Sequence, residues 1–390
     1  MENYSILTTT QDLEQFATAN EGIEWMAIDT EFIGEKRYQT LLCLIQVATP
    51  NGLYIFDVLK LPNIDRLLTF IVNDNILKIS HAGENDYRLM NELYQIIPKN
   101  VFDTQIAAGF VGYRYPISFR ALVQAELQIR VNKAQTVTDW EKRPINTKQI
   151  RYALNDVIPL KELYDKLCSK INKLGRMEWV QEEMQKIEHP KFYVKDPYRE
   201  VLNHSALPTL GRAEQLFLVR LFQWRRQLAE ERNHSKEMVL AKKYILPIVK
   251  TVHLGKDGLK QNRRISERFV KRYGDKMVQL YQQDSNEEEL EVIARIPNRV
   301  MIPPEKDQKL ELLYSFINYR CLDQKVAADL VLPRGLFKQM KENAQLEDEN
   351  LQTSWRREIL GDVIMQSLKN RGDLEVELKE GSLQLKIKAK

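Results

Sequence analysis

The sequence has few of the features that mark secreted, zinc-bound or membrane proteins. Only 3 cysteines occur among 390 residues, and they lie far apart, with no C-x-x-C pair and no nearby histidine. That spacing excludes a zinc clip and a disulfide framework, and it suits a reducing compartment. The longest apolar run, residues 41–48, is interrupted by Gln46 and is too short to cross a bilayer. The first residues carry neither a basic nor an apolar segment, so we expect no signal peptide, no membrane association and a cytoplasmic protein.

Charge is unevenly distributed along the chain. The net charge is +4, but residues 211–280 contain 17 Lys+Arg against 7 Asp+Glu, a local balance of +10. The rest of the chain therefore sums to −6. Such a segment is a candidate module for binding a polyanion. A solvated basic face explains the charge equally well, so charge alone leaves both interpretations open.

The first 175 residues predict a mixed α/β domain, one of two or three domains in a chain of this length. Short apolar runs predict strands, two of them joined by the turn Pro50-Asn51-Gly52, at residues 23–29, 41–49, 52–58 and 76–80. Helical patterns occupy residues 64–73, 85–97, 119–127 and 147–167. This mixture predicts helices packed on a central sheet.

The second half of the chain predicts an all-α architecture. Proline-spotted residues 176–210 are typical of a linker. Apolar residues at helical spacing follow, at residues 217–228, 237–241, 264–281, 309–325, 334–345 and 354–369. Residues 373–390 alternate apolar and charged side chains, which predicts a hairpin or a frayed tail.

The first candidate site residues stand in Ile28-Asp29-Thr30-Glu31. Side chains at i and i+2 of a strand point to the same face, so Asp29 and Glu31 project together. Two neighbouring carboxylates raise each other's pKa unless a cation lies between them, and Mg²⁺ or Mn²⁺ is the natural occupant. Taken alone, such a pair is more often two acids that face solvent at the end of a strand.

Three further residues complete the set. Asp86 falls in the first turn of a helix that follows the strand at 76–80, where an acid also favours the helix N-terminus; on chemistry alone Glu84 competes with it. Tyr152 and Asp156, at i and i+4, share a helix face, so a phenol could orient a water beside a metal-bound acid. The alternative is an amphipathic helix with Tyr152 in the core. Pro159 predicts a kink just beyond Asp156.

The order of these residues resembles the DEDD exonucleases, and the tyrosine marks the DEDDy branch. The sequence around and between them is similar to the ribonuclease D family over residues 1 to about 175. The similar blocks are Ala27-Ile28-Asp29-Thr30-Glu31-Phe32, Leu42-Cys43-Leu44-Ile45-Gln46, Phe102-Asp103-Thr104-Gln105, Thr138-Asp139-Trp140 and Arg151-Tyr152-Ala153. This alignment, and not periodicity, selects Asp86 over Glu84.

The resemblance implies a ribonuclease H-like (DnaQ-like) exonuclease domain. It implies two divalent ions, Mg²⁺ or Mn²⁺, and a tyrosine that positions the attacking water; the implied metal ligands are Asp29, Glu31, Asp86 and Asp156. The expected reaction is hydrolysis from RNA 3′ ends, releasing 5′-mononucleotides. The expected substrates are tRNA precursors and other small structured RNAs with 3′ tails, and the expected oligomeric state is a monomer.

The C-terminal half resembles HRDC domains, which are helical bundles associated with nucleic-acid binding. One copy is expected at residues 211–292, a second, diverged copy at 293–372 and a tail or hairpin at 373–390. The candidate RNA contacts are Lys133, Trp140, Arg143, Arg225, Arg226, Lys242, Lys243, Arg263 and Arg264. For Trp140, core packing is at least as good an interpretation.

Two other functions remain possible on this evidence. A DEDDy exonuclease that acts on DNA would carry the same four acids, because a contact to the 2′-OH decides between RNA and DNA. A non-catalytic RNA-binding protein on a nuclease scaffold is the other, but such scaffolds usually lose an acid and this chain keeps all four.

Overall fold

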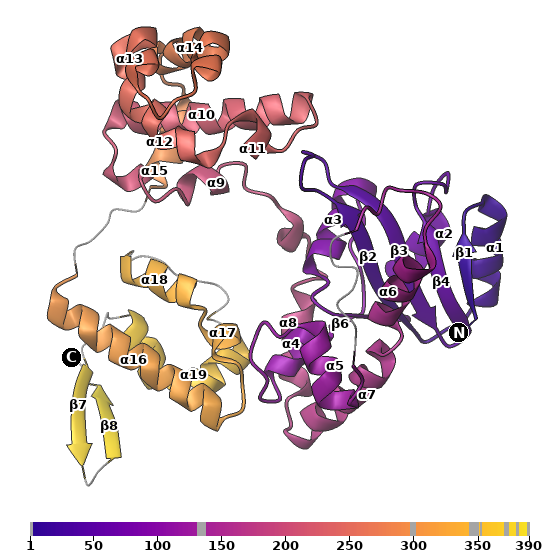
Figure 1. The fold of residues 1–390 in the computed structure, drawn as a ribbon. Helices are drawn as coiled ribbons and strands as arrows, with labels where there is room; N and C mark the ends of the chain where they lie inside the picture. Colours follow the sequence, from indigo (N-terminus) through magenta and orange to yellow (C-terminus); the bar gives the residue numbers. More distant parts are fainter. Residues whose placement is uncertain are drawn as a thin grey trace. The chain divides into compact units, whose positions relative to one another are not determined.

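The structure is a computed structural model that describes residues 3–130, 138–296, 302–342, 351, 353–369, 374–379 and 382–387. The chain divides into two compact units (Figure 1). The first comprises residues 1–32, 42–193 and 300–390, and the second comprises residues 33–41 and 194–299. Within the described ranges, no helix is both long and apolar enough to cross a membrane.

A six-stranded sheet forms the centre of the first unit, in the order β1-β4-β3-β2-β5-β6 (Figure 1). β3 and β4 are antiparallel and joined by the predicted turn, whereas β2, β5 and β6 run parallel. The strands are β1 (Tyr4–Leu7), β2 (Trp25–Ile33), β3 (Leu41–Thr49), β4 (Gly52–Asp57), β5 (Leu77–Ser80) and β6 (Val101–Asp103). The parallel strands end at one edge of the sheet, so groups at their carboxyl ends can meet there.

The edge strands β1 and β6 were not predicted, because runs of 4 and 3 residues carry too little periodicity to stand out. The helix after β1 was also missed, although Thr9 and Asp12 form a capping box at its start. The helices of this part are α1 (Thr10–Ala19), α2 (Asp65–Ile71), α3 (Glu84–Tyr94), α4 (Thr104–Gly109), α5 (Phe119–Leu127), α6 (Thr147–Val157), α7 (Leu160–Lys173) and α8 (Met177–Gln185), with a 3₁₀ turn at Pro190–Tyr193.

Helices cover both faces of the sheet, and β2 shows how its residues divide between them. Met26 and Ile28 are buried in the core formed with α1, α2 and α3. Ala27 lies instead in a smaller core with Val157 and Leu160, at the junction of α6 and α7. Alternate side chains of β2 therefore face α3 on one side and α6 on the other.

The helix predicted over residues 147–167 is two helices. Pro159 has no N–H to donate to the carbonyl of Asn155, and α6 ends at Val157 while α7 begins at Leu160. The predicted kink is therefore a complete break. Asp156 occupies the last turn of α6.

Residues 176–210, predicted as a linker, include α8, whose Val180 and Met184 are buried in a core of the first unit. The prolines that suggested a linker lie beyond α8, at positions 190, 197 and 208. The prediction was wrong for residues 177–185, because two buried apolar side chains on a short helix give only a weak pattern.

The C-terminal helices of the first unit share this core. Trp355 is 0% exposed and meets Phe110 edge to face, with ring centroids 4.8 Å apart. The Ala327 N–H donates to the Gly109 carbonyl at 2.7 Å. The two segments pack so closely here that a Cβ atom on Gly109 would collide with the Leu330 side chain. The elements are α16 (Pro304–Asp323), α17 (Ala328–Val331), α18 (Arg334–Glu342) and α19 (Ser354–Lys369), followed by an antiparallel hairpin of β7 (Leu374–Lys379) and β8 (Ser382–Ile387). That this region is a second HRDC copy stays a prediction.

The second unit is helical and packs around α10. Phe217, Leu218 and Leu221 of that helix are all fully buried. Arg220 is buried as well and forms an ion pair with Glu289 at 2.7 Å. The helices are α9 (Arg199–Leu202), α10 (Arg212–Glu231), α11 (Lys236–Val239), α12 (Lys242–Thr251), α13 (Gly255–Gln261), α14 (Glu267–Gln282) and α15 (Glu287–Ala294), with 3₁₀ turns at Leu207–Thr209 and Val252–Leu254.

The shared core makes a testable prediction. Trp355→Ala should cost about 3–5 kcal/mol of stability, because it removes a fully buried aromatic ring. Hydrogen exchange followed by mass spectrometry should show protection falling in β6 and α4 as well as in α19. Leu322→Ala is the control, since that side chain is 75% exposed in the same region. Loss of protection confined to residues 302–369 would contradict a common core.

Candidate active site

The end of β2 positions the first two acids. Its pairing with β5 runs as far as Ala27, so the residues after Ala27 lie at the carboxyl edge of the sheet. Asp29 and Glu31 follow at intervals of two and therefore face the side covered by α6. There Asp156 meets them: a carboxylate oxygen from each of the three acids lies within 4.8 Å of the others. Oxygen atoms at this spacing suit a hard divalent cation.

Asp86 lies on the other side of the strand, outside the group of three acids whose oxygens lie within 4.8 Å of one another. It lies in the first turn of α3 and accepts a hydrogen bond from the Thr30 hydroxyl, and Thr30 faces α3 because it alternates with Asp29 and Glu31. Its carboxylate raises the pKa of Glu31, although burial and two nearer acids raise it more. Glu84 is exposed and pairs with Arg88 at 2.9 Å, so the geometry favours Asp86 over Glu84.

All four carboxyl groups hold protons more tightly than usual. Burial raises the pKa of Asp29 to about 6, and burial with the neighbouring Asp29 charge raises that of Asp156 to about 8. Burial and three acidic neighbours raise the pKa of Glu31 to about 9, and burial with the charges of Asp29 and Asp103 raises the pKa of Asp86. Ionisation of all four would concentrate negative charge where little water can compensate it, and a divalent cation would relieve that repulsion.

Tyr152 stands one turn before Asp156 on α6 and is half-buried. Burial and the charges of Asp156, Glu31 and Asp29 raise the pKa of its hydroxyl above the ordinary value. The phenol therefore keeps its proton at neutral pH. It can donate a hydrogen bond and orient a water, but it cannot act as a phenolate base.

Comparison with known proteins agrees with this arrangement. The family model described as a 3′-5′ exonuclease matches residues 4–172, and the HRDC domain model matches residues 214–281. Ribonuclease D of Sphingobium indicum is 28% identical over 393 residues, 99% of each chain. Ribonuclease D of Desulfotalea psychrophila is 29% identical over 328 residues, 82% of this chain and 86% of the relative.

The chain belongs to the ribonuclease D family. Its fold matches the crystal structure of Escherichia coli RNase D, an exoribonuclease involved in structured RNA processing, with a TM-score of 0.80 and 22% identity. That match covers 95% of this chain and all of the other. The catalytic core of RRP6 from Trypanosoma brucei aligns with a TM-score of 0.58 over 72% of this chain and 79% of that one, at 24% identity. The ribonuclease H-like exonuclease fold with an HRDC domain is confirmed.

Two residues around the site of this nuclease were not singled out from the sequence. The Gln46 amide donates to Asp29 at 2.6 Å from a fully buried position on β3. Thr30 donates to Asp86 in the same way. A signal was present for Gln46, because it is the one polar residue in the apolar run 41–48 and a buried amide needs a partner. Nothing in the sequence pointed to Thr30.

The structure gives Trp140 and Arg143 packing roles in place of the predicted RNA contacts. Trp140 is 5% exposed and lies 6.1 Å from the Tyr152 ring, centroid to centroid. Arg143 binds both carboxylate oxygens of Asp57, at 2.8 and 2.7 Å, and also donates to the Trp140 and Cys43 carbonyls. With these partners, neither side chain is available to stack on or clasp RNA. Lys133 lies outside the described residues.

Arg225 is a further correction. Its side chain is 1% exposed, forms ion pairs with Glu200 and Glu237 at 2.9 Å each, and donates to the Leu240 carbonyl at 2.7 Å. Exposing it to phosphate would break a buried ion-pair network, which is strongly unfavourable. Arg226 is half-buried and donates to the Pro197 carbonyl at 3.0 Å. The remaining predicted cations are exposed: Lys242, Lys243, Arg263 and Arg264.

The crowded acids predict a pH-dependent stability. The folded protein holds the Glu31 proton up to a pKa of about 9, against an ordinary value of 4.5, so the metal-free fold binds more protons than the unfolded chain. Its stability should therefore fall as pH rises from about 4.5 to about 9. Glu31→Gln should lose less stability across this window, measured as melting temperature in EDTA from pH 5 to 9. The exposed Glu84→Gln is the control, and parallel curves for Glu31→Gln and wild type would contradict the account.

Proposed function

We propose that the four acids hold two divalent metal ions, and that the chain uses them to remove nucleotides hydrolytically from RNA 3′ ends. The observation that carries the proposal is the convergence of Asp29, Glu31 and Asp156 within 4.8 Å, with Asp86 tied to the same strand through Thr30. The expected products are 5′-mononucleotides. The relatives named ribonuclease D support RNA as the substrate class.

The residues present fit divalent metal ions. The candidate ligands are carboxylates, which Mg²⁺ and Mn²⁺ prefer, and no cysteine or imidazole is among them. All four have raised pKa values, chiefly because of burial, so a bound cation would favour their ionised forms. Bound ions would supply charge to activate the attacking water and to stabilise the departing 3′ oxygen.

The protein's own side chains position the acids and the attacking water. Gln46 orients Asp29 from β3, and Thr30 orients Asp86 from β2. Because α3 and α6 pack on opposite faces of the sheet, they bring their acids to the end of β2 from two directions. Tyr152 keeps a proton and can hold the attacking water by hydrogen bonding.

Removal of the acids tests the site. Asp29→Ala and Asp156→Asn should each lower the rate of mononucleotide release by at least about 10²-fold, because each removes a proposed metal ligand. Tyr152→Phe should lower kcat about 10²-fold while metal binding persists. Digestion of 3′-labelled and 5′-labelled RNA, with and without Mg²⁺, reports direction and metal dependence. Full activity of Asp156→Asn in a folded protein would refute the assignment, and matched DNA oligonucleotides test the choice of RNA.

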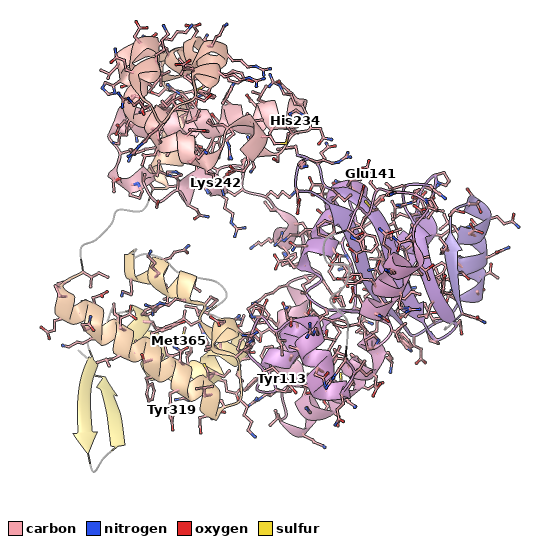
Figure 2. All side chains as sticks on the ribbon, viewed as in Figure 1. Tyr113, Glu141, His234, Lys242, Tyr319 and Met365 are labelled. Atoms are coloured by element: carbon pink, nitrogen blue, oxygen red, sulfur yellow. The ribbon has the colours of Figure 1, made fainter. Side chains whose placement is uncertain are left out.

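We also propose that the second unit binds RNA through exposed basic side chains. Lys242 and Lys243 begin α12, where Figure 2 labels Lys242, and Arg263 and Arg264 lie between α13 and α14. Lys/Arg contacts to phosphate give affinity without sequence preference. Arg226 stays a weaker candidate because one of its nitrogens already donates to Pro197. We propose tRNA precursors and other structured RNAs with unpaired 3′ tails as substrates of a monomeric enzyme.

Salt dependence tests this surface. The double variant Lys242→Ala/Lys243→Ala should bind RNA more weakly. It should also reduce the slope of log K against log salt by about 0.7 for each phosphate of single-stranded RNA that it no longer neutralises. Lys60→Ala/Lys173→Ala removes the same charge from exposed positions of the first unit and is the matched control. Equal slopes for the two double variants would contradict a specific role of α12.

A further inference from the structure

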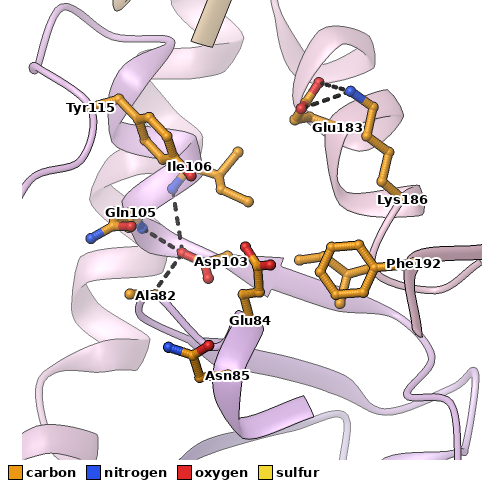
Figure 3. Close-up of a pocket in the computed structure, with 11 residues that line it drawn as sticks. Ala82, Glu84, Asn85, Asp103, Gln105, Ile106, Tyr115, Glu183, Lys186 and Phe192 are labelled. Carbon is orange, nitrogen blue, oxygen red and sulfur yellow. Dashed lines mark hydrogen bonds and ion pairs between the residues drawn. The ribbon is translucent and has the colours of Figure 1, made fainter. Parts of the chain in front are cut away.

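A pocket of about 260 Å³ lies in the first unit beside the N-terminus of α3 (Figure 3). Its walls come from three places: the first turn of α3, the β6–α4 junction with Tyr115, and α8 with Phe192. The proposed mechanism uses none of these side chains. Every residue that lines the pocket belongs to the first unit.

The pocket is a close neighbour of the proposed metal site. Asn85, which lines it, directly precedes Asp86. Asp103, which also lines it, ends β6, and β6 is separated from β2 only by β5 in the sheet. Two strand spacings are about 10 Å. The pocket and the acids therefore lie along the same carboxyl edge of the parallel strands, where ligands of such sheets bind.

Charge argues against a phosphate or a cation in this pocket, because its charged side chains already have partners. Glu84 pairs with Arg88 at 2.9 Å. Glu183 pairs with Lys186 at 2.8 Å (Figure 3) and also with a buried arginine, Arg356, at 2.9 Å. Asp103 accepts hydrogen bonds from the backbone N–H groups of residues 82, 83, 105 and 106. An uncharged ligand fits such a lining without breaking an ion pair.

Size and shape favour a small planar ring system. The volume is below the roughly 300–1,000 Å³ typical of pockets for drug-sized molecules. Ile106, Ile187 and Phe192 supply apolar walls. The guanidinium of Arg88 lies 3.9 Å from the centroid of the Phe192 ring and holds that ring in place. Aromatic and aliphatic walls of this kind accept the face of a heteroaromatic ring.

Polar groups on the opposite wall can read the edge of such a ring. The Asn85 amide offers both a donor and an acceptor. The Gln105 amide nitrogen donates to the Ile117 carbonyl at 2.8 Å, which fixes the amide and leaves its oxygen and one N–H to offer. The Tyr115 hydroxyl keeps its proton, because burial and nearby acids raise its pKa to about 12. Mixed donors and acceptors beside an apolar wall are what an unpaired nucleobase requires.

We infer that this pocket is a base-binding subsite that takes an unpaired nucleobase of the RNA substrate, upstream of the 3′-terminal nucleotide. The inference rests on the proposed function. An exonuclease that cleaves the last phosphodiester has, beyond the leaving nucleotide, only upstream nucleotides to hold. Binding one of their bases beside α3 would align the terminal phosphodiester with the metal site and would require an unpaired 3′ tail.

The test couples a pocket variant to an abasic substrate. The variant Asn85→Ala/Tyr115→Phe removes two polar groups from the wall and should lower kcat/KM on a single-stranded RNA of ten nucleotides about tenfold, mainly through KM. An abasic residue is then moved along the RNA one position at a time. At one upstream position it should cost the wild type about tenfold and cost the variant little, because the two changes remove the same interaction.

The control variant is Asn172→Ala/Tyr94→Phe, which makes the same two chemical changes in the same unit outside the pocket. It should respond to each abasic position as the wild type does. Coupling only at the 3′-terminal position, or at none, would overturn the upstream subsite while leaving the exonuclease assignment intact. A folded wild-type protein that degrades no RNA would overturn the proposed function, and this inference with it.

Discussion

The mutual repulsion of four partly buried carboxyl groups is the constraint around which the first unit is organised. Burial raises the pKa values of Asp29, Glu31, Asp86 and Asp156, and neighbouring acidic charges raise those of Glu31, Asp86 and Asp156 further. Such a cluster lowers the stability of the metal-free fold at neutral pH. The surrounding structure tolerates it because Met26, Ala27 and Ile28, which precede the acids on β2, are buried in the core.

The alternation of β2 explains how acids from three elements gather around the end of one strand, with Asp29, Glu31 and Asp156 on one face and Asp86 on the other. Asp29 and Glu31 face α6, and Thr30 faces α3, so a single strand contacts both helices that carry the remaining acids. Gln46 stabilises the first acid from the adjoining strand. A shift of one residue in the register of β2 would move Asp29 and Glu31 to the face of α3 and would separate them from Asp156.

Buried arginines account for two of the 17 Lys+Arg residues of the segment that first suggested a nucleic-acid surface. Arg220 and Arg225, both within the +10 segment, form ion pairs inside the second unit. In the first unit, Arg176 and Arg356 bind carbonyls and Glu183, and thereby tie α7–α8 to the C-terminal helices. Arginine suits these places because its planar guanidinium makes several hydrogen bonds at once. Sequence charge alone therefore overstated the surface available to RNA.

The order of amino acids was enough to predict the strong strands, the pairing of Asp29 with Glu31, the shared face of Tyr152 and Asp156, and the family resemblance. These features depend on periods of two and 3.6 residues, or on motifs, which a sequence displays directly. It could not favour Asp86 over Glu84 without that resemblance, nor separate the packed Trp140, Arg143 and Arg225 from exposed cations. Burial and ion pairing depend on contacts between residues far apart in the chain. The same holds for the short strands β1 and β6, which their neighbours in the sheet stabilise, and for the pocket beside α3. Those residues come together only when the chain folds, because their partners are distant in sequence.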